Sequence, residues 1–302
     1  MPNIWTHMLF CEDVVDSIGK NPFPTYEHYM NLGAQGPDPF FYYNFWPWIK
    51  EDHIQDIGLL LHQRHCGAFL MDLITSAKSS IPEVQAYVFG FVTHHILDRN
   101  THPYIHYRAG YEGNKHQKLE VCIDTLMMEK DKNIKTWKVP VYKEINVGPS
   151  LHEDIIELLH ETIKKHYPMV EEETTYYIEK SYRDMKLALR ILSDPFGWKN
   201  ALLASLISSY SHRPIKDNVD YLNKDRTTWY HPATNQPCTK SFIDLYEQGR
   251  IEAIEIGSTI LKYWKDENVT ETHLRELIGD ISYDTGKPLN LNLENKYCDP
   301  IV

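Results

Sequence analysis

The chain has 302 residues, and 42% of them are hydrophobic, so it can bury a sizeable core and is not predicted to be disordered. Its formal net charge of −11 argues against broad affinity for nucleic acid or anionic membranes, because phosphate groups attract basic surfaces. A phosphate-bearing substrate stays compatible with this charge where metal ions supply the local positive charge.

The first half of the chain is predicted to be helical, because its apolar residues recur at helical spacing. A first helix is capped by Asn3 or Thr6 and ends at Ile18. Pro103 disfavours helical geometry at His102, so the helix that begins at Pro82 is predicted to end near residue 100 or to bend there. The other helices predicted in this half cover residues 26–32, 54–77 and 115–128.

The second half follows the same pattern after a mixed, proline-containing connection over residues 131–150. A long polar and aromatic loop is predicted over residues 212–238, and the tail from Tyr283 is predicted to be irregular. Strand signals are almost absent, so the predicted fold class is all-α, in a single domain over residues 1–302. Helices are predicted over residues 151–166, 171–192, 200–209, 240–264 and 270–276.

The five cysteines are scattered and odd in number, which does not indicate a disulfide framework and suits a reducing compartment. The N-terminal sequence has no basic region followed by a long apolar stretch, so we expect no signal peptide. No run approaches 18 apolar residues, so we also expect no membrane span. Together these features predict a cytoplasmic protein.

Histidines and acids are concentrated in residues 89–120, which read FGFVTHHILDRNTHPYIHYRAGYEGNKHQKLE. Asp98 lies four residues from both His94 and His102, and Glu120 lies four residues after His116, so on a helix each pair shares one face. Imidazole nitrogens and carboxylate oxygens held this way bind borderline ions such as Zn²⁺. About two pairs with a histidine four residues before an acid are expected by chance in such a chain, and two occur, His94 with Asp98 and His116 with Glu120. The number of pairs is therefore not informative, but their position in one short segment is.

Further candidate ligands lie upstream on other predicted elements: His7, Asp38, His62 and His65. A multi-metal site needs ligands from several elements, because one helix face cannot surround an ion. A single buried histidine is more often a hydrogen-bonded core residue, so the grouping carries the interpretation. Structural zinc sites usually use cysteine pairs, and no C-x2-C pair occurs, so the pattern indicates a multi-metal enzyme.

The order of these motifs resembles the zinc-dependent phospholipase C superfamily, whose relatives include single-strand-specific nucleases. The resemblance covers roughly residues 1–130, which it identifies as the metal-binding part, followed by a helical C-terminal part over residues 151–302. It implies an all-helical bundle that holds zinc ions and cleaves phosphoester bonds. The motifs are, in order, His7, GAQGPD ending at Asp38, IGLLLH ending at His62, GFVTHHILD, HPYIHY and HQKLE.

The resemblance also implies a role for each matching residue. Asp38 would be the general base, and His7 with one oxygen of Asp98 would hold a third ion. Secreted relatives add an N-terminal tryptophan to that third site, but Trp5 is not the first residue here, so two or three ions are expected. His106 remains an alternative to His102, and His65 an alternative to His62. The implied ligands are Asp38, His62, His94 and Asp98 for a first ion, and His102, His116 and Glu120 for a second.

No competing catalytic motif occurs: there is no G-x-S-x-G elbow, no Walker loop, no G-x-G-x-x-G and no His-Asp dipeptide. We therefore expect a metal-dependent phosphoester hydrolase that acts on a phospholipid or a soluble phosphodiester, with nuclease activity as a variant of the same chemistry. The alternative hypothesis is a non-catalytic protein that keeps its metals as a structural core or a sensor. Zinc is the expected ion, although Fe, Mn or Ni also suit these ligands.

Overall fold

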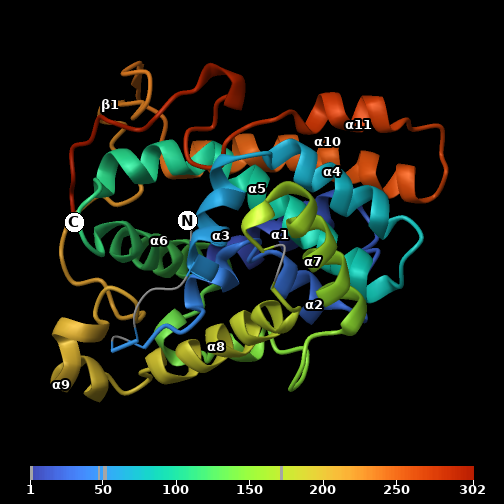
Figure 1. Cartoon of the computed structure of the whole chain (residues 1–302). Helices are drawn as coiled ribbons and strands as arrows, with labels where there is room; N and C mark the ends of the chain where they lie inside the picture. Colours follow the sequence, from blue (N-terminus) through green and yellow to red (C-terminus); the bar gives the residue numbers. More distant parts are fainter. Residues whose placement is uncertain (1–2, 47, 50–52, 171–172) are drawn as a thin grey trace.

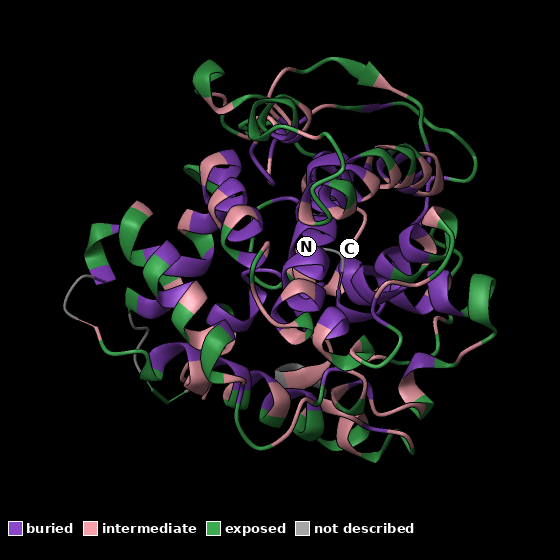
Figure 2. Cartoon of the chain, turned by 90° about the vertical axis from the view of Figure 1, so that its right-hand side faces the viewer, coloured by how far each residue is buried: buried purple, intermediate pink, exposed green. Residues whose placement is uncertain are grey.

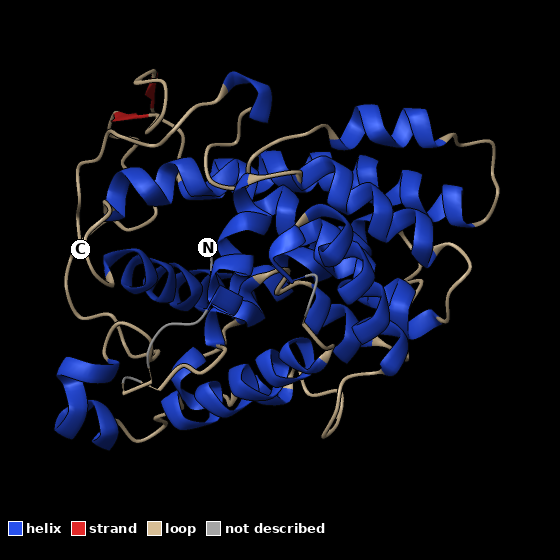
Figure 3. Cartoon of the chain, in the orientation of Figure 1, coloured by secondary structure: helices blue, strands red, loops and turns tan. Residues whose placement is uncertain are grey.

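A computed structural model describes residues 3–46, 48–49, 53–170 and 173–302. Its regular structure is almost entirely helical, which confirms the all-α prediction (Figure 3). The two short strands β1 (Trp229–Tyr230) and β2 (Pro237–Cys238) pair antiparallel within the loop predicted over residues 212–238. The α-helices are α1 (Ile4–Ile18), α2 (Glu27–Gly33), α3 (His53–Gln63), α4 (Cys66–Ala77), α5 (Pro82–Ala109), α6 (Lys115–Lys132), α7 (Glu153–His166), α8 (Tyr176–Leu192), α9 (Trp198–Ile207), α10 (Phe242–Trp264) and α11 (Glu271–Ile278).

The long helix α5 is the centre of the molecule (Figure 1). From Val84 to Ala109 every residue is buried except Gln85 and His106, which are half-buried. Helices α1, α2, α4, α6 and α10 all pack against it. Figure 2 shows the buried residues gathered on the inner helices and the exposed ones on the outer segments. The polar residues of α5 are therefore enclosed by other helices.

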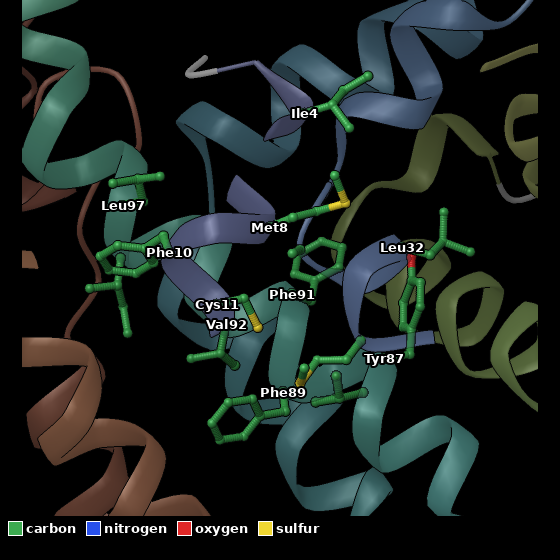
Figure 4. Packing of buried hydrophobic residues seen from close by; sticks show 14 of the residues in the cluster. Ile4, Met8, Phe10, Cys11, Leu32, Tyr87, Phe89, Phe91, Val92 and Leu97 are labelled. Carbon is green, nitrogen blue, oxygen red and sulfur yellow. The ribbon is translucent and has the colours of Figure 1, made fainter. Parts of the chain in front are cut away.

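The apolar core fills the space between α1, α2 and α5, where Met8, Leu32 and Phe91 are among its members (Figure 4). Two glycines let α2 and α5 approach closely. A Cβ atom at Gly33 would overlap the Tyr87 carbonyl group, and one at Gly90 would overlap the α2 backbone. This close contact holds the turn that follows α2 next to the middle of α5.

The single helix predicted over residues 54–77 is wrong, because the structure has two helices there, α3 and α4. The break is at His65, whose φ of 54° and ψ of 25° lie in the left-handed region. A right-handed helix cannot continue through that conformation. His62 therefore lies in α3, before the break, whereas His65 lies at the break itself. This difference matters for the choice between them as ligands.

Helix α5 was predicted to end near residue 100 or to bend at His102, but it continues to Ala109 with Pro103 inside it. Proline has no N–H group, so the carbonyl of Arg99 loses its helical partner. Gly286 of the C-terminal segment packs against that carbonyl so closely that a Cβ atom would overlap it. Tertiary packing on a buried helix therefore overrides the local preference.

Other predicted boundaries differ by a few residues. Helix α8 begins at Tyr176 rather than at residue 171, which lies outside the described residues. Helix α10 begins after Ser241, whose hydroxyl group accepts a hydrogen bond from the Asp244 amide in a capping box. The irregular tail is confirmed apart from a 3-10 turn (Leu289–Leu291), and its Asp299 and Ile301 amides donate to carbonyl groups at the end of α5. Among the described residues, no helix is both long and apolar enough to cross a membrane.

Candidate metal centre

Five side chains from four segments meet beside the middle of α5, and we call them the Asp98 cluster: His7 of α1, Asp38 at the start of a 3-10 turn (Asp38–Tyr42), His62 of α3, and His94 and Asp98 of α5. Their elements converge near the centre of the view in Figure 1. His94 and Asp98 share one helix face because they are four residues apart. The Nε2 atom of His94 lies 3.0 Å from Oδ2 of Asp98.

Asp98 occupies the middle of its cluster, because its two oxygens face different imidazoles. Oδ2 also lies 3.7 Å from Nε2 of His62. Oδ1 lies 3.4 Å from Nε2 of His7 and 3.3 Å from Nε2 of His102. A carboxylate with one oxygen toward each of two groups of nitrogens is arranged to bridge two cations.

Asp38 faces the same cluster from the opposite side. Its Oδ1 atom lies 3.7 Å from Nε2 of His62 and 3.6 Å from Nε2 of His94. Burial raises the pKa of Asp38 well above its usual value. Its side chain is 10% exposed, compared with 0% for Asp98, so Asp38 is the less deeply buried of the two carboxylates.

Backbone carbonyl groups orient two of the imidazoles. The Nδ1 atom of His62 lies 2.6 Å from the Gly58 carbonyl oxygen, and Nδ1 of His94 lies 3.0 Å from that of Ala34. When each Nδ1–H donates to its carbonyl group, each Nε2 presents a lone pair to the cluster. Metal-ligating histidines are usually held in this way. Gly36, with a φ of 51°, lies against the His94 ring, where a Cβ atom would overlap it.

A second group, the Glu120 cluster, consists of His102 of α5 and His116 and Glu120 of α6. The Nε2 atom of His116 lies 2.7 Å from Oε1 of Glu120, which is one helical turn away. The rings of His102 and His116 have centroids 5.7 Å apart. His102 therefore stands between the two clusters, because its Nε2 faces Asp98.

The buried polar atoms of the Asp98 cluster fit a group of positive charge. Within the described residues, both oxygens of Asp98 and the Nε2 atoms of His7, His62 and His94 make no hydrogen bond. Each such buried atom costs about 1–3 kcal/mol if it stays unsatisfied. A cation satisfies a carboxylate and several imidazole lone pairs at once.

Burial keeps three imidazoles of the two clusters, those of His7, His102 and His116, in the form that a cation needs. It lowers the pKa of His7 well below its usual value, and it lowers that of His102 to about 3. The pKa of His116 is likewise lowered, first by burial. Neutral imidazole has a free lone pair, whereas imidazolium has none. The donor set and its protonation state therefore both fit zinc.

The sequence profile of the family described as zinc dependent phospholipase C matches residues 6–170. This match covers more than half of the chain. The protein belongs to the zinc dependent phospholipase C family. No curated protein and no solved structure was found to match the chain.

Within this member of the zinc dependent phospholipase C family, the structure brings all predicted ligands into the two clusters, and their roles as ligands stay predictions. His65, the alternative to His62, lies outside both clusters, with its ring 5.9 Å from that of His166. His102 and His106 need not exclude each other as ligands, because both lie in a group of potential ligands with Asp284. The predicted ligands are His7, Asp38, His62, His94, Asp98, His102, His116 and Glu120.

The backbone amide of Trp5 has a structural role. The backbone N–H groups of Trp5 and Thr6 donate to Asp124 of α6, at 3.1 and 2.9 Å. Asp124 therefore caps the first turn of α1, and in doing so it joins the helix that carries His7 to the helix that carries Glu120.

One acidic residue of the centre was missed by the sequence analysis. Oδ1 of Asp284 lies 3.5 Å from Nδ1 of His102 and 3.5 Å from Nε2 of His106. Asp284 lies in the irregular tail, outside the residues that match the zinc dependent phospholipase C family. No helical spacing relates it to the histidines, so only the fold reveals the contact.

Proposed function

We propose that this protein is a metal-dependent hydrolase of phosphoester bonds, with two or three zinc ions in the described clusters. The observation that supports this proposal most is the environment of Asp98, a fully buried carboxylate with imidazoles around both oxygens. Membership of the zinc dependent phospholipase C family supports the same chemistry. The substrate class is a phospholipid or a soluble phosphodiester.

The ligands of the first ion would be Asp38, His62, His94 and Asp98. The first three lie close enough together to hold one ion, and Oδ2 of Asp98 lies 3.7 Å from Nε2 of His62 and 3.0 Å from that of His94. When bound, such ions neutralise phosphoryl oxygens and lower the pKa of a coordinated water. Asp98 would bridge two sites with its two oxygens. Imidazole binds a metal ion as a neutral ligand, so it would leave the positive charge of the ions available to attract a phosphate group.

Asp38 would be the general base that takes a proton from the attacking water. It is the less deeply buried carboxylate of its cluster, with a side chain that is 10% exposed against 0% for Asp98, so of the two it would stand nearer to an entering water molecule. Burial, which raises its pKa, also makes its ionised form a stronger base. Its Oδ1 faces His62 and His94, so the base would act beside the bound phosphate.

The experiment is a hydrolysis assay with bis-p-nitrophenyl phosphate, phosphatidylcholine vesicles and a single-stranded oligonucleotide. We expect turnover of at least one phosphodiester, its loss after chelation, and its recovery when zinc is returned. Full activity of metal-free protein would contradict the proposal. Zinc-loaded protein without turnover on any of these substrates would favour the non-catalytic alternative.

The same assay tests the base through Asp38→Asn. We expect kcat to fall by about 10²–10⁴-fold, the usual contribution of a general base, while most of the zinc stays bound. The matched control is Asp56→Asn, which removes an exposed carboxylate of α3 and should leave kcat unchanged. A wild-type rate in Asp38→Asn would show that another group accepts the proton.

A further inference from the structure

The C-terminal segment from Ile278 to Pro288 is attached firmly to the metal-binding helices. The Ile281 carbonyl oxygen lies 2.9 Å from Nε2 of His95, and the Ile278 carbonyl accepts from the Arg99 guanidinium at 2.6 Å. The Tyr283 amide donates to the His62 carbonyl at 3.1 Å. The residue beside it, Asp284, is therefore held in place by contacts on both α3 and α5.

Tyr283 adds a side-chain contact to these backbone bonds. Its ring centroid lies 4.8 Å from that of His62 and 4.4 Å from that of His95. The side chain is almost completely buried. The segment thus forms one wall of the centre, and Asp284 enters the centre from that wall.

The two oxygens of Asp284 have different environments. Oδ2 accepts a hydrogen bond from Nε2 of Gln63 at 2.9 Å. Oδ1 faces His102 and His106, each at 3.5 Å, which is longer than a normal N–H···O hydrogen bond. Two ligand atoms of one tetrahedral zinc ion are about 3.4 Å apart, so the longer spacing fits a shared cation.

The imidazoles around Asp284 have the spacing of ligands of one ion. Ring centroids are 5.5 Å apart for His102 and His106, 4.8 Å for His106 and His116, and 5.7 Å for His102 and His116. Zinc–nitrogen distances of about 2.0–2.1 Å at tetrahedral angles place two imidazole centroids about 5 Å apart. The three ring spacings are therefore compatible with ligands of one cation.

Two of these imidazoles are without hydrogen bonds inside the protein. In the described part of the chain, neither ring nitrogen of His102 or of His106 makes a hydrogen bond. The side chain of His102 is only 2% exposed, so water does not readily replace the missing partners. A buried side chain without partners that points at Asp284 is evidence for a ligand between them.

We propose that Asp284 and His106 are ligands of the second ion, beside His102, His116 and Glu120. The C-terminal segment, which lies outside the family match, would thus complete the metal centre. The inference rests on the metal-binding part of the proposed function and not on turnover. A set with three imidazoles and two carboxylates suits five-coordinate zinc, and also Fe or Mn.

The test is the zinc content and zinc affinity of Asp284→Asn, measured by elemental analysis after dialysis and by chelator competition. Asparagine keeps the volume and can still accept from Gln63, so the wall stays in place while the ligand charge is lost. We expect one zinc equivalent fewer per chain than wild type, or at least tenfold weaker binding of one equivalent. Glu294→Gln, at an exposed acid further along the C-terminal tail, is the matched control and should bind zinc like wild type.

His106→Gln should lose the same equivalent, and the double variant should lose no more than either single variant, because both ligands hold one ion. Cobalt-substituted protein gives a second readout, since loss of a ligand changes its visible absorption spectrum. If Asp284→Asn does not fold, the zinc content of His106→Gln tests the inference instead, because the His106 side chain is partly exposed.

Wild-type zinc stoichiometry and affinity in these variants would overturn the inference, even in an active hydrolase. Loss of zinc without any phosphodiesterase activity in wild type would leave it standing while the proposed function fails.

Discussion

His94 and His95 are neighbours in the sequence, but α5 turns them to different partners. His94 faces Asp98 and Asp38 with Nε2, whereas Nε2 of His95 lies 2.9 Å from the Ile281 carbonyl oxygen. Successive residues of a helix point about 100° apart, so only one of two adjacent histidines can enter the cluster. Both are fully buried, and burial alone does not identify a ligand.

The pair supplies a matched test of the metal centre. We expect His94→Gln to lose at least one zinc equivalent, because it removes a proposed ligand of the first ion. His95→Gln should keep the zinc of wild type and lower the free energy of unfolding by about 1–3 kcal/mol, the cost of a broken buried hydrogen bond. Elemental analysis and urea denaturation distinguish the two effects. Equal zinc loss in both variants would mean that His94 acts only in packing.

At the scale of elements, the position of Asp38 depends on how closely α2 packs on α5. Gly33 is the last residue of α2, and the turn that follows it leads through Gly36 to Asp38. A side chain at Gly33 would push α2 away from the Tyr87 carbonyl. The same contact therefore determines both the packing of two helices and the place of a predicted ligand.

Gly33→Ala should lower the free energy of unfolding by about 1–3 kcal/mol, the usual cost of overpacking. It should also lower kcat in the phosphodiesterase assay, because the turn that carries the proposed base Asp38 moves with α2. Gly249→Ala in α10 is the control, since its Cβ atom would meet Asn100 at an ordinary 3.4 Å. That variant should be neutral or up to about 1 kcal/mol more stable. Urea denaturation measures both, and equal stability of the two variants would contradict the packing argument.

At the scale of the whole molecule, the core carries several imidazoles that burial keeps neutral. Burial lowers the pKa of His7 and His95 well below the usual value, and that of His102 to about 3. In the unfolded chain the same groups take up protons near pH 6.5. At these histidines the unfolded state therefore binds more protons below that pH, so the free energy of unfolding falls with falling pH. Asp38, whose pKa burial raises, acts in the opposite sense, but the lowered imidazoles outnumber it.

Zinc-depleted protein should therefore be less stable at pH 5 than at pH 7. His102 alone accounts for about 2 kcal/mol over this interval, because its folded pKa lies well below both values. Urea denaturation in chelator at the two pH values measures the difference. Zinc-loaded protein should in addition release its metal as the pH falls, since protons compete for the same lone pairs. Equal urea midpoints of the zinc-depleted protein at pH 5 and pH 7 would contradict the conclusion that the buried imidazoles are neutral.

Local patterns predicted most of the helices, because apolar periodicity and caps act within a few residues of each other. The two main errors arose where distant contacts outweigh local preference. Pro103 was expected to end α5, but the C-terminal segment packs against the carbonyl that it leaves free. The break at His65 was missed, because nothing in the local spacing indicates a left-handed residue there.

By itself, the sequence determined the helical class and nearly all of the candidate ligands, because both depend on residue type at short, regular spacing. It also indicated the family, because the order of the motifs can be recognised in the sequence alone. Only the tertiary structure brought His106 and Asp284 next to His102 and left His65 outside both clusters. The physical reason is that a metal site is defined by atoms meeting in space, and the tail reaches that place through contacts that no sequence period encodes.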